Sequence, residues 1–145
     1  MTLLHYHQGD LFELAPEGAS LAHCVSADLA MGKGIAKEFK NRFGGFEKLR
    51  KQNPKPGKTL VLEVEETFVY YLVTKMMARD KPEGFYFYRA LRDLRTLMEA
   101  RQETQLWIPK IGCGLDELNW DDQVSGWLEK IFGGWEGEIH VCVLN

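Results

Sequence analysis

The sequence predicts an α/β fold in which helices cover a largely parallel sheet. The first observation is an alternation along the chain: strand-like apolar segments are separated by segments whose apolar residues recur at helical spacing. Helices between strands imply the crossover connections of parallel pairs. The second observation is that two glycine loops follow predicted strands, which is where such sheets bind ligands.

The predicted elements follow the order β-β-α-β-β-α-β-α-β. Strands are predicted at residues 3–7, 20–25, 59–64, 68–74, 105–109 and 138–144. Helices are predicted at residues 35–43, 88–101 and 121–132, with a short amphipathic piece at 46–51.

The first half of the chain supports this order through its apolar pattern and its glycines. The strand at 20–25 is almost continuously apolar, as in a strand buried in a sheet. Ile35, Phe39 and Phe43 recur at helical spacing, and the glycine pair after Phe43 gives a left-handed helix end. The strands at 59–64 and 68–74 are joined by a short acidic turn.

The second half follows the same logic. Two apolar stripes define its helices: Leu91, Leu94, Leu97 and Met98 in the first, and Trp120, Val124, Trp127, Leu128 and Ile131 in the second. We interpret Trp120, Trp127 and Trp135 as core or helix-packing residues. The aromatic run at 85–88 is interpreted as a loop that enters a helix; packing over the sheet edge is the favoured role, and stacking on a base is the alternative.

Composition predicts one globular domain spanning residues 1–145. The chain is 45% hydrophobic and 27% charged, which is ordinary for a soluble protein. At this length a single core buries roughly two thirds of the unfolded surface. No apolar run approaches a membrane span, and the N-terminus lacks a secretory signal. We expect a monomer in the cytoplasm, or in the nucleus of a eukaryote, with no membrane partner.

Charge and cysteine content disfavour several other classes. The net charge of −3 disfavours a long duplex nucleic acid as a structural partner, and the basic cluster at 48–58 is interpreted as a solvated loop. Three cysteines without a C-x-x-C motif predict neither a disulfide framework nor a zinc site. His5 and His7 form an H-x-H pair without a third ligand nearby in sequence, so no metal or cofactor is expected.

The glycine loops are the candidate binding elements. Gly32, Lys33 and Gly34 open the helix at 35–43, where free N–H groups and the helix dipole favour an anion. The alternative is a plain tight turn. A second G-x-G loop, at 110–116, ends in Asp116 and lies before the last helix. Two such loops can hold a diphosphate from both sides.

Lys75 ends the apolar strand at 68–74, so its amine is expected at the same sheet edge. Lysines at strand ends are usually solvated, whereas a lysine in a pocket can lose its proton through desolvation and act as a nucleophile. Asp116 by itself is compatible with a solvated residue flanking a helix. The residues alone leave both alternatives open.

Six motifs in one order resemble those of a macrodomain, and more closely those of its terminal ADP-ribose protein glycohydrolase branch. The motifs are GDLF at 9–12, SLAHCVS at 20–26, MGKGIA at 31–36, FGG at 43–45, YYLVTK at 70–75 and PKIGCGLD at 109–116. The resemblance covers nearly the whole chain. It implies a three-layer α/β/α fold with a mixed, mostly parallel central sheet that holds ADP-ribose at its edge.

The resemblance also assigns roles by position. It implies that Lys75 and Asp116 are catalytic. It places at the adenine end Asp10, Leu11 and Leu144. The residues that it places at the distal ribose and diphosphate are Ser26, Gly32, Lys33, Gly34, Ile35 and Ala36. The residues that it places in the second phosphate-binding loop are Lys110, Ile111, Gly112, Cys113, Gly114 and Leu115.

The implied activity is removal of ADP-ribose from a modified protein carboxylate or nucleobase, which reverses ADP-ribosylation and links the chain to DNA damage. In this hypothesis Lys75 attacks the anomeric carbon and Asp116 handles protons. The segment 23–26 lacks the Asn-Asn pair of other hydrolytic macrodomains, which favours the lysine mechanism. O-acetyl-ADP-ribose is a further expected substrate. The alternatives are a non-catalytic ADP-ribose reader and a phosphatase of ADP-ribose-1″-phosphate.

Overall fold

A computed structural model describes residues 3–81, 83–111 and 118–144. Its strands are β1 (Leu4–Gln8), β2 (Ser20–Ser26), β3 (Thr59–Val64), β4 (Thr67–Lys75), β5 (Gln105–Pro109) and β6 (Glu138–Val143). Its helices are α1 (Leu11–Leu14), α2 (Gly34–Phe43), α3 (Phe46–Arg50), α4 (Gly84–Ala100), a π-helical turn η1 (Trp120–Val124) and α5 (Ser125–Ile131). None of the helices described is long and apolar enough to cross a membrane.

The six strands form one sheet in the order β1-β6-β5-β2-β4-β3. Every neighbouring pair is parallel except β3 and β4, which form an antiparallel hairpin. The hairpin arises because only a short turn joins these two strands, whereas each parallel pair requires a crossover. The predicted mixed, mostly parallel sheet is confirmed.

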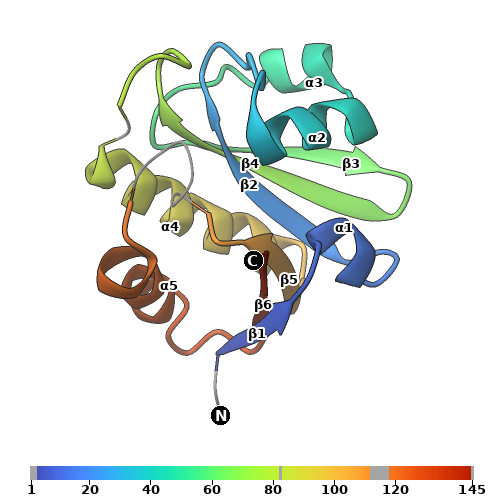
Figure 1. The fold of residues 1–145 in the computed structure, drawn as a ribbon, viewed down its shortest axis with the longest axis vertical. Helices are drawn as coiled ribbons and strands as arrows, with labels where there is room; N and C mark the ends of the chain where they lie inside the picture. Colours follow the sequence, from blue (N-terminus) through green and yellow to red (C-terminus); the bar gives the residue numbers. More distant parts are fainter. Residues whose placement is uncertain (1–2, 82, 112–117, 145) are drawn as a thin grey trace.

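Helices cover both faces of the sheet, as Figure 1 shows: α4 and α5 lie on one side, and α1, α2 and α3 on the other. Each face has its own apolar cluster. The α4–α5 side packs Leu91, Leu94 and Met98 of α4 against β4, β5 and β6. The opposite side packs Phe39 of α2 and Leu49 of α3 against β2, β3 and β4. The predicted three-layer architecture is therefore confirmed.

Most element ends differ from the prediction by at most one residue, and three differences affect an element as a whole. Helix α1 is additional: it is a single turn capped by Asp10, too short to show helical periodicity. Helix α4 begins at Gly84, so the aromatic run at 85–88 lies inside the helix and the interpretation as a loop is wrong. There Gly84 packs against the Trp127 ring, where an added Cβ would lie 3.1 Å from a ring carbon. The last helix begins one residue early, as the π-helical turn η1.

The three tryptophans pack as predicted. Trp120 is buried and donates its indole N–H to the Tyr6 hydroxyl at 3.0 Å. Trp127 contacts the ring of Phe87, and Trp135 contacts the ring of Phe132. All three belong to or pack against the apolar cluster on the α4–α5 side.

Candidate active site at the carboxyl ends of the strands

The carboxyl ends of β2 and β4 bring Ser26 and Lys75 together. Ser26 is the register partner of Lys75, after a bulge between Val25 and Ser26. The next amide, that of Ala27, donates to the Lys75 carbonyl at 2.8 Å. Lys75 is half-buried, and the Ser26 side chain is buried. A serine hydroxyl and a lysine amine thus lie on adjacent strand ends, where open α/β sheets bind their ligands.

Asp28 organises the loop that follows β2, and the sequence reasoning missed it. Its Oδ1 accepts the Ser26 hydroxyl at 2.5 Å and the Ala30 amide at 3.2 Å, and its Oδ2 accepts the Ala78 amide at 3.2 Å. Burial raises the pKa of Asp28, but these hydrogen bonds outweigh it and hold the pKa below its usual range. One carboxylate therefore ties the loop after β2 to the segment after β4.

The loop from Asp28 to α2 is held in an unusual backbone conformation. Leu29 and Met31 have positive φ angles of 55° and 42°, and both side chains are buried. Left-handed φ is rare for such residues and costs free energy. Packing of these side chains beneath the loop offsets that cost. The loop is therefore held in one conformation up to the glycines that follow it.

The first glycine loop presents open backbone to solvent. An added Cβ on Gly32 would meet no atom within 4 Å. Helix α2 begins at Gly34, and its N-cap residue, Lys33, makes no side-chain hydrogen bond to the first turn. The first-turn amides of this ten-residue helix therefore point outward with a positive dipole end. Ile35 and Ala36 pack beneath the loop against the adjoining apolar cluster.

The expected adenine end lies at β1 and β6. Asp10 caps α1 by accepting the Phe12 amide at 3.1 Å. The pKa of the Cys142 thiol is raised, first by burial and then by the Asp10 carboxylate. Leu11 is buried, so its side chain belongs to the core, whereas Leu144 is 70% exposed. A hollow of about 250 Å³ opens at this edge, lined by residues of β1 and β6.

The second glycine loop is described only in part. Lys110 is exposed, and Ile111 is buried in the cluster on the α4–α5 side. Gly112, Cys113, Gly114, Leu115 and Asp116 lie outside the described residues. Their assigned roles, that of Asp116 above all, stay predictions.

His23 lies buried beneath the site and was not singled out from the sequence. Its ring stacks on Phe39 with centroids 3.8 Å apart and meets Tyr71 edge-on at 4.8 Å. Burial lowers the pKa of His23 to about 3, so the ring is neutral. Among the described residues, neither its ring nitrogens nor the Tyr71 hydroxyl have a hydrogen-bond partner. The ring thus serves as an aromatic support that holds α2 on the sheet.

The H-x-H pair acquires a third histidine from β6. His7 Nε2 lies 2.9 Å from Nδ1 of His140, whose Nε2 lies 2.8 Å from Gln105 Oε1. The Trp107 ring stacks on His140 at 4.3 Å. Within the described ranges, no group of three or more histidine, cysteine or acidic side chains is arranged to hold a metal ion.

No family model matches the chain. The chain is 40% identical to a human ADP-ribose glycohydrolase (OARD1) over 139 residues, 96% of this chain and 90% of that protein. The bovine ADP-ribose glycohydrolase (OARD1) matches with the same identity and coverage.

Solved structures show the same fold. The macrodomain of Mycobacterium tuberculosis DarG superposes with a TM-score of 0.83 at 26% identity, covering 97% of this chain and 96% of that chain. Thermosipho africanus DarTG in complex with ADP-ribose superposes with a TM-score of 0.77 at 21% identity, covering 96% of this chain and 41% of that one. The order of the motifs, the topology of the sheet and the 40% identity over nearly the whole chain all point to one family. The chain belongs to the terminal ADP-ribose glycohydrolase-like branch of the macrodomain superfamily.

Proposed function

We propose that this chain is an ADP-ribosyl hydrolase: it binds ADP-ribose at the carboxyl ends of β2, β4 and β6 and cleaves the glycosidic bond at its distal ribose. The observation that carries the proposal is the pairing of Ser26 with Lys75 at the ends of β2 and β4, where the chain leaves β2 for the open glycine loop of α2. The 40% identity to relatives named ADP-ribose glycohydrolases supports the reaction class.

Binding rests on the diphosphate. The first-turn amides of α2 donate hydrogen bonds to the diphosphate oxygens, and the positive end of the helix dipole favours the negative charge. Asp28 ties the segment that leads into this loop to Ser26 and to the amide of Ala78, three residues after Lys75. Anchoring the diphosphate in this way holds the distal ribose in position for attack, which replaces a bimolecular encounter with a pre-oriented one.

The reaction has two steps. In the first, the unprotonated Lys75 Nζ attacks C1″ of the distal ribose, and the bond from C1″ to the attached carboxylate oxygen or base nitrogen breaks with its electron pair leaving on that atom. In the second, Asp116 removes a proton from water, which attacks C1″ and releases free ADP-ribose and the lysine amine. The group attached to ADP-ribose is a protein glutamate or aspartate, or a nucleobase.

A panel of substrates tests the proposal. It contains glutamate-ADP-ribosylated protein, thymidine-ADP-ribosylated DNA, O-acetyl-ADP-ribose and ADP-ribose-1″-phosphate, each incubated with wild type, Lys75→Ala and Asp116→Ala. We expect wild type to release free ADP-ribose from the first or second substrate, and both variants to lose at least about 10³-fold in kcat/KM. Lys81→Ala is the control, because Lys81 is an exposed lysine beyond the end of β4. Tight binding of ADP-ribose without release from any substrate identifies a reader instead.

A further inference from the structure

A second concave surface lies on the α4–α5 side of the sheet. It encloses about 860 Å³, more than three times the volume of the hollow beside β1 and β6. We call it the basic groove; the side chains that give it its character are Lys58, Tyr88, Arg89, Arg92, Arg95 and Lys130. Among the described lining residues, five are cationic and one, Asp93, is acidic.

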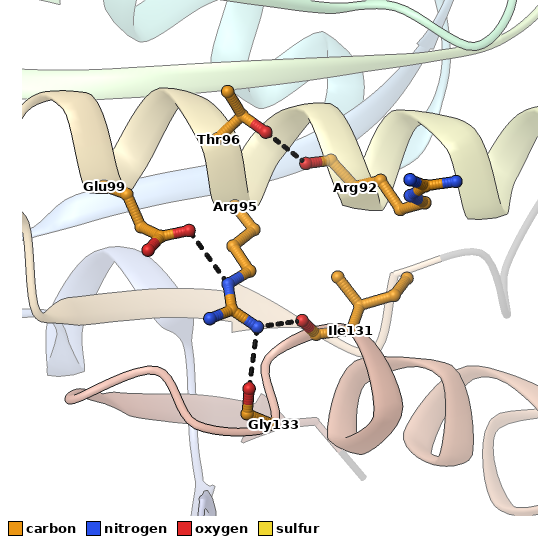
Figure 2. A network of polar contacts seen from close by, with 6 residues as sticks. All are labelled: Arg92, Arg95, Thr96, Glu99, Ile131 and Gly133. Carbon is orange, nitrogen blue, oxygen red and sulfur yellow. Dashed lines mark hydrogen bonds and ion pairs between the residues drawn. The ribbon is translucent and has the colours of Figure 1, made fainter.

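Two of the cations are committed to the fold. Arg95 donates to Glu99 at 2.9 Å and to the carbonyls of Ile131 and Gly133 at 2.5 and 2.8 Å, which ties α4 to the end of α5 (Figure 2). Lys58 donates a hydrogen bond from its amine to the Gln52 carbonyl. These contacts hold the two side chains in fixed positions. The backbone carbonyls among their acceptors are neutral, so both side chains keep their positive charge.

The remaining cations face solvent. Figure 2 shows the Arg92 guanidinium directed away from the Arg95 network. Among the described residues, no carboxylate lies within ion-pair distance of Arg89, Arg92 or Lys130, and all three are exposed. Asp93 accepts the Thr59 amide at 2.8 Å and so caps β3 rather than pairing with an arginine. A protein whose net charge is −3 thus gathers unneutralised positive charge in one groove, as an anionic ligand requires.

Aromatic rings alternate with these cations. Tyr88 lines the groove, with Lys130 Nζ 5.9 Å from its ring centroid. One turn earlier, Phe85 is 63% exposed, and the Arg89 guanidinium lies 5.6 Å from its ring centroid. Arginines suit bidentate contacts to phosphate, and exposed rings stack on bases. An acidic peptide would use the charges but has no need of the exposed ring.

We propose that the basic groove binds a single strand of nucleic acid through its phosphates, with Phe85 and Tyr88 as stacking platforms. This site is distinct from the ADP-ribose site and needs no ADP-ribosyl group on the strand. The two sites are neighbours, because the Gly57 amide at the groove wall donates to the Val73 carbonyl at 2.8 Å, two residues before Lys75. The proposal does not depend on the proposed hydrolase activity.

The test is fluorescence anisotropy with an unmodified, labelled single strand of about 10 nucleotides, a length within the range such grooves accommodate. We expect wild type to bind it at low salt, with an affinity that falls as salt rises. The double charge reversal Arg89→Glu/Arg92→Glu should weaken binding at least about tenfold. The matched control is Lys48→Glu/Lys51→Glu on and beside α3, which makes the same change in net charge on the opposite face.

The outcomes separate the alternatives. Support requires loss in the groove variant alone, with ADP-ribose affinity unchanged in both variants. Phe85→Ala should also weaken binding of the strand, without altering the dependence of that binding on salt. Equal loss in both charge variants, absence of binding by wild type, or displacement of the strand by free ADP-ribose would overturn the proposal. Competition by poly-glutamate as strong as that by the unlabelled strand would assign the groove to an acidic protein segment instead. All substituted residues are exposed, so these variants should keep the circular dichroism and melting temperature of wild type.

Discussion

On the α4–α5 face, a helix of 17 residues lays a regular apolar stripe along the sheet and buries five of its side chains. On the other face lie helices of four, ten and five residues, and the loop that leads from β2 into the ten-residue helix contains left-handed Leu29 and Met31. The regular face carries the basic groove, and the irregular face carries the glycine loop beside Lys75. Where backbone amides must be presented to a ligand, the chain uses short helices and loops that tertiary contacts hold in place. Where charged and aromatic side chains are presented, they stand on a long helix and on the segments beside it.

A pair of core truncations gives the largest expected effects and tests this contrast. Leu94→Ala on the regular face and Phe39→Ala on the irregular face each remove a fully buried side chain. Each should lower the free energy of unfolding by about 3–5 kcal/mol, measured by urea denaturation. Only Phe39→Ala should also weaken ADP-ribose binding, measured by calorimetry below the melting transition, because α2 carries the glycine loop. Equal loss of ADP-ribose affinity in both variants would mean that the two faces support the site alike.

The next largest effect is the dependence of the free energy of unfolding on pH, which we attribute to His23. Its pKa is about 3 in the folded protein against an ordinary value of 6.5, so the unfolded chain binds a proton in this interval and the folded one does not. Stability is therefore retained above pH 6.5 and falls as pH drops, by roughly 2–3 kcal/mol at pH 4.5. His23→Phe keeps the stacking on Phe39 and removes the titration.

Urea midpoints at pH 7 and pH 4.5 measure this effect. The variant should lose less stability over the interval than wild type, and at pH 7 it should be as stable or more so, since it removes unpartnered buried nitrogens. The pKa of His140 is also lowered, first by burial and then by the nearby His7. His140→Phe is therefore the control that measures the contribution of this second histidine. Identical pH dependence in wild type and His23→Phe would contradict the account of His23.

Asp28 gives the smallest effect on stability and a larger one on binding. Asp28→Ala removes the acceptor for Ser26, Ala30 and Ala78 from an exposed loop. We expect a loss of about 1 kcal/mol in the free energy of unfolding and about tenfold in ADP-ribose affinity. Asp80→Ala is a matched control, since Asp80 accepts a single loop amide, that of Met77, at 3.0 Å. If Asp28→Ala leaves the affinity unchanged, the carboxylate does not shape the site.

The regular face was predictable from the sequence and the irregular one only in part. The stripe of Leu91, Leu94 and Met98 shows α4 through its spacing alone, and the apolar strands give the sheet. The conformation at Leu29 is invisible in sequence, because it depends on contacts such as the bond from Ala78 to Asp28, 50 residues away. His23 reads as one polar residue in an apolar strand, and nothing local signals that Phe39 covers it.

The site was predicted by motif rather than by spacing. The position of Lys75 at the end of a strand is equally typical of a solvated lysine. Only the resemblance of the motifs to those of macrodomains assigned it a catalytic role. The parallel register then places Ser26 beside it. The basic groove escaped prediction because its cations come from α4, α5 and the residue before β3, and only the fold brings these segments together.

The most direct test of the account is to trap the covalent intermediate. If Lys75 is the nucleophile and Asp116 directs water, Asp116→Ala should accumulate an ADP-ribosyl adduct when incubated with substrate. Intact-mass spectrometry should show the added mass, and peptide mapping should locate it on Lys75. Lys75→Ala/Asp116→Ala should show no adduct. Absence of an adduct in Asp116→Ala, together with full turnover by Lys75→Ala, would contradict the lysine mechanism.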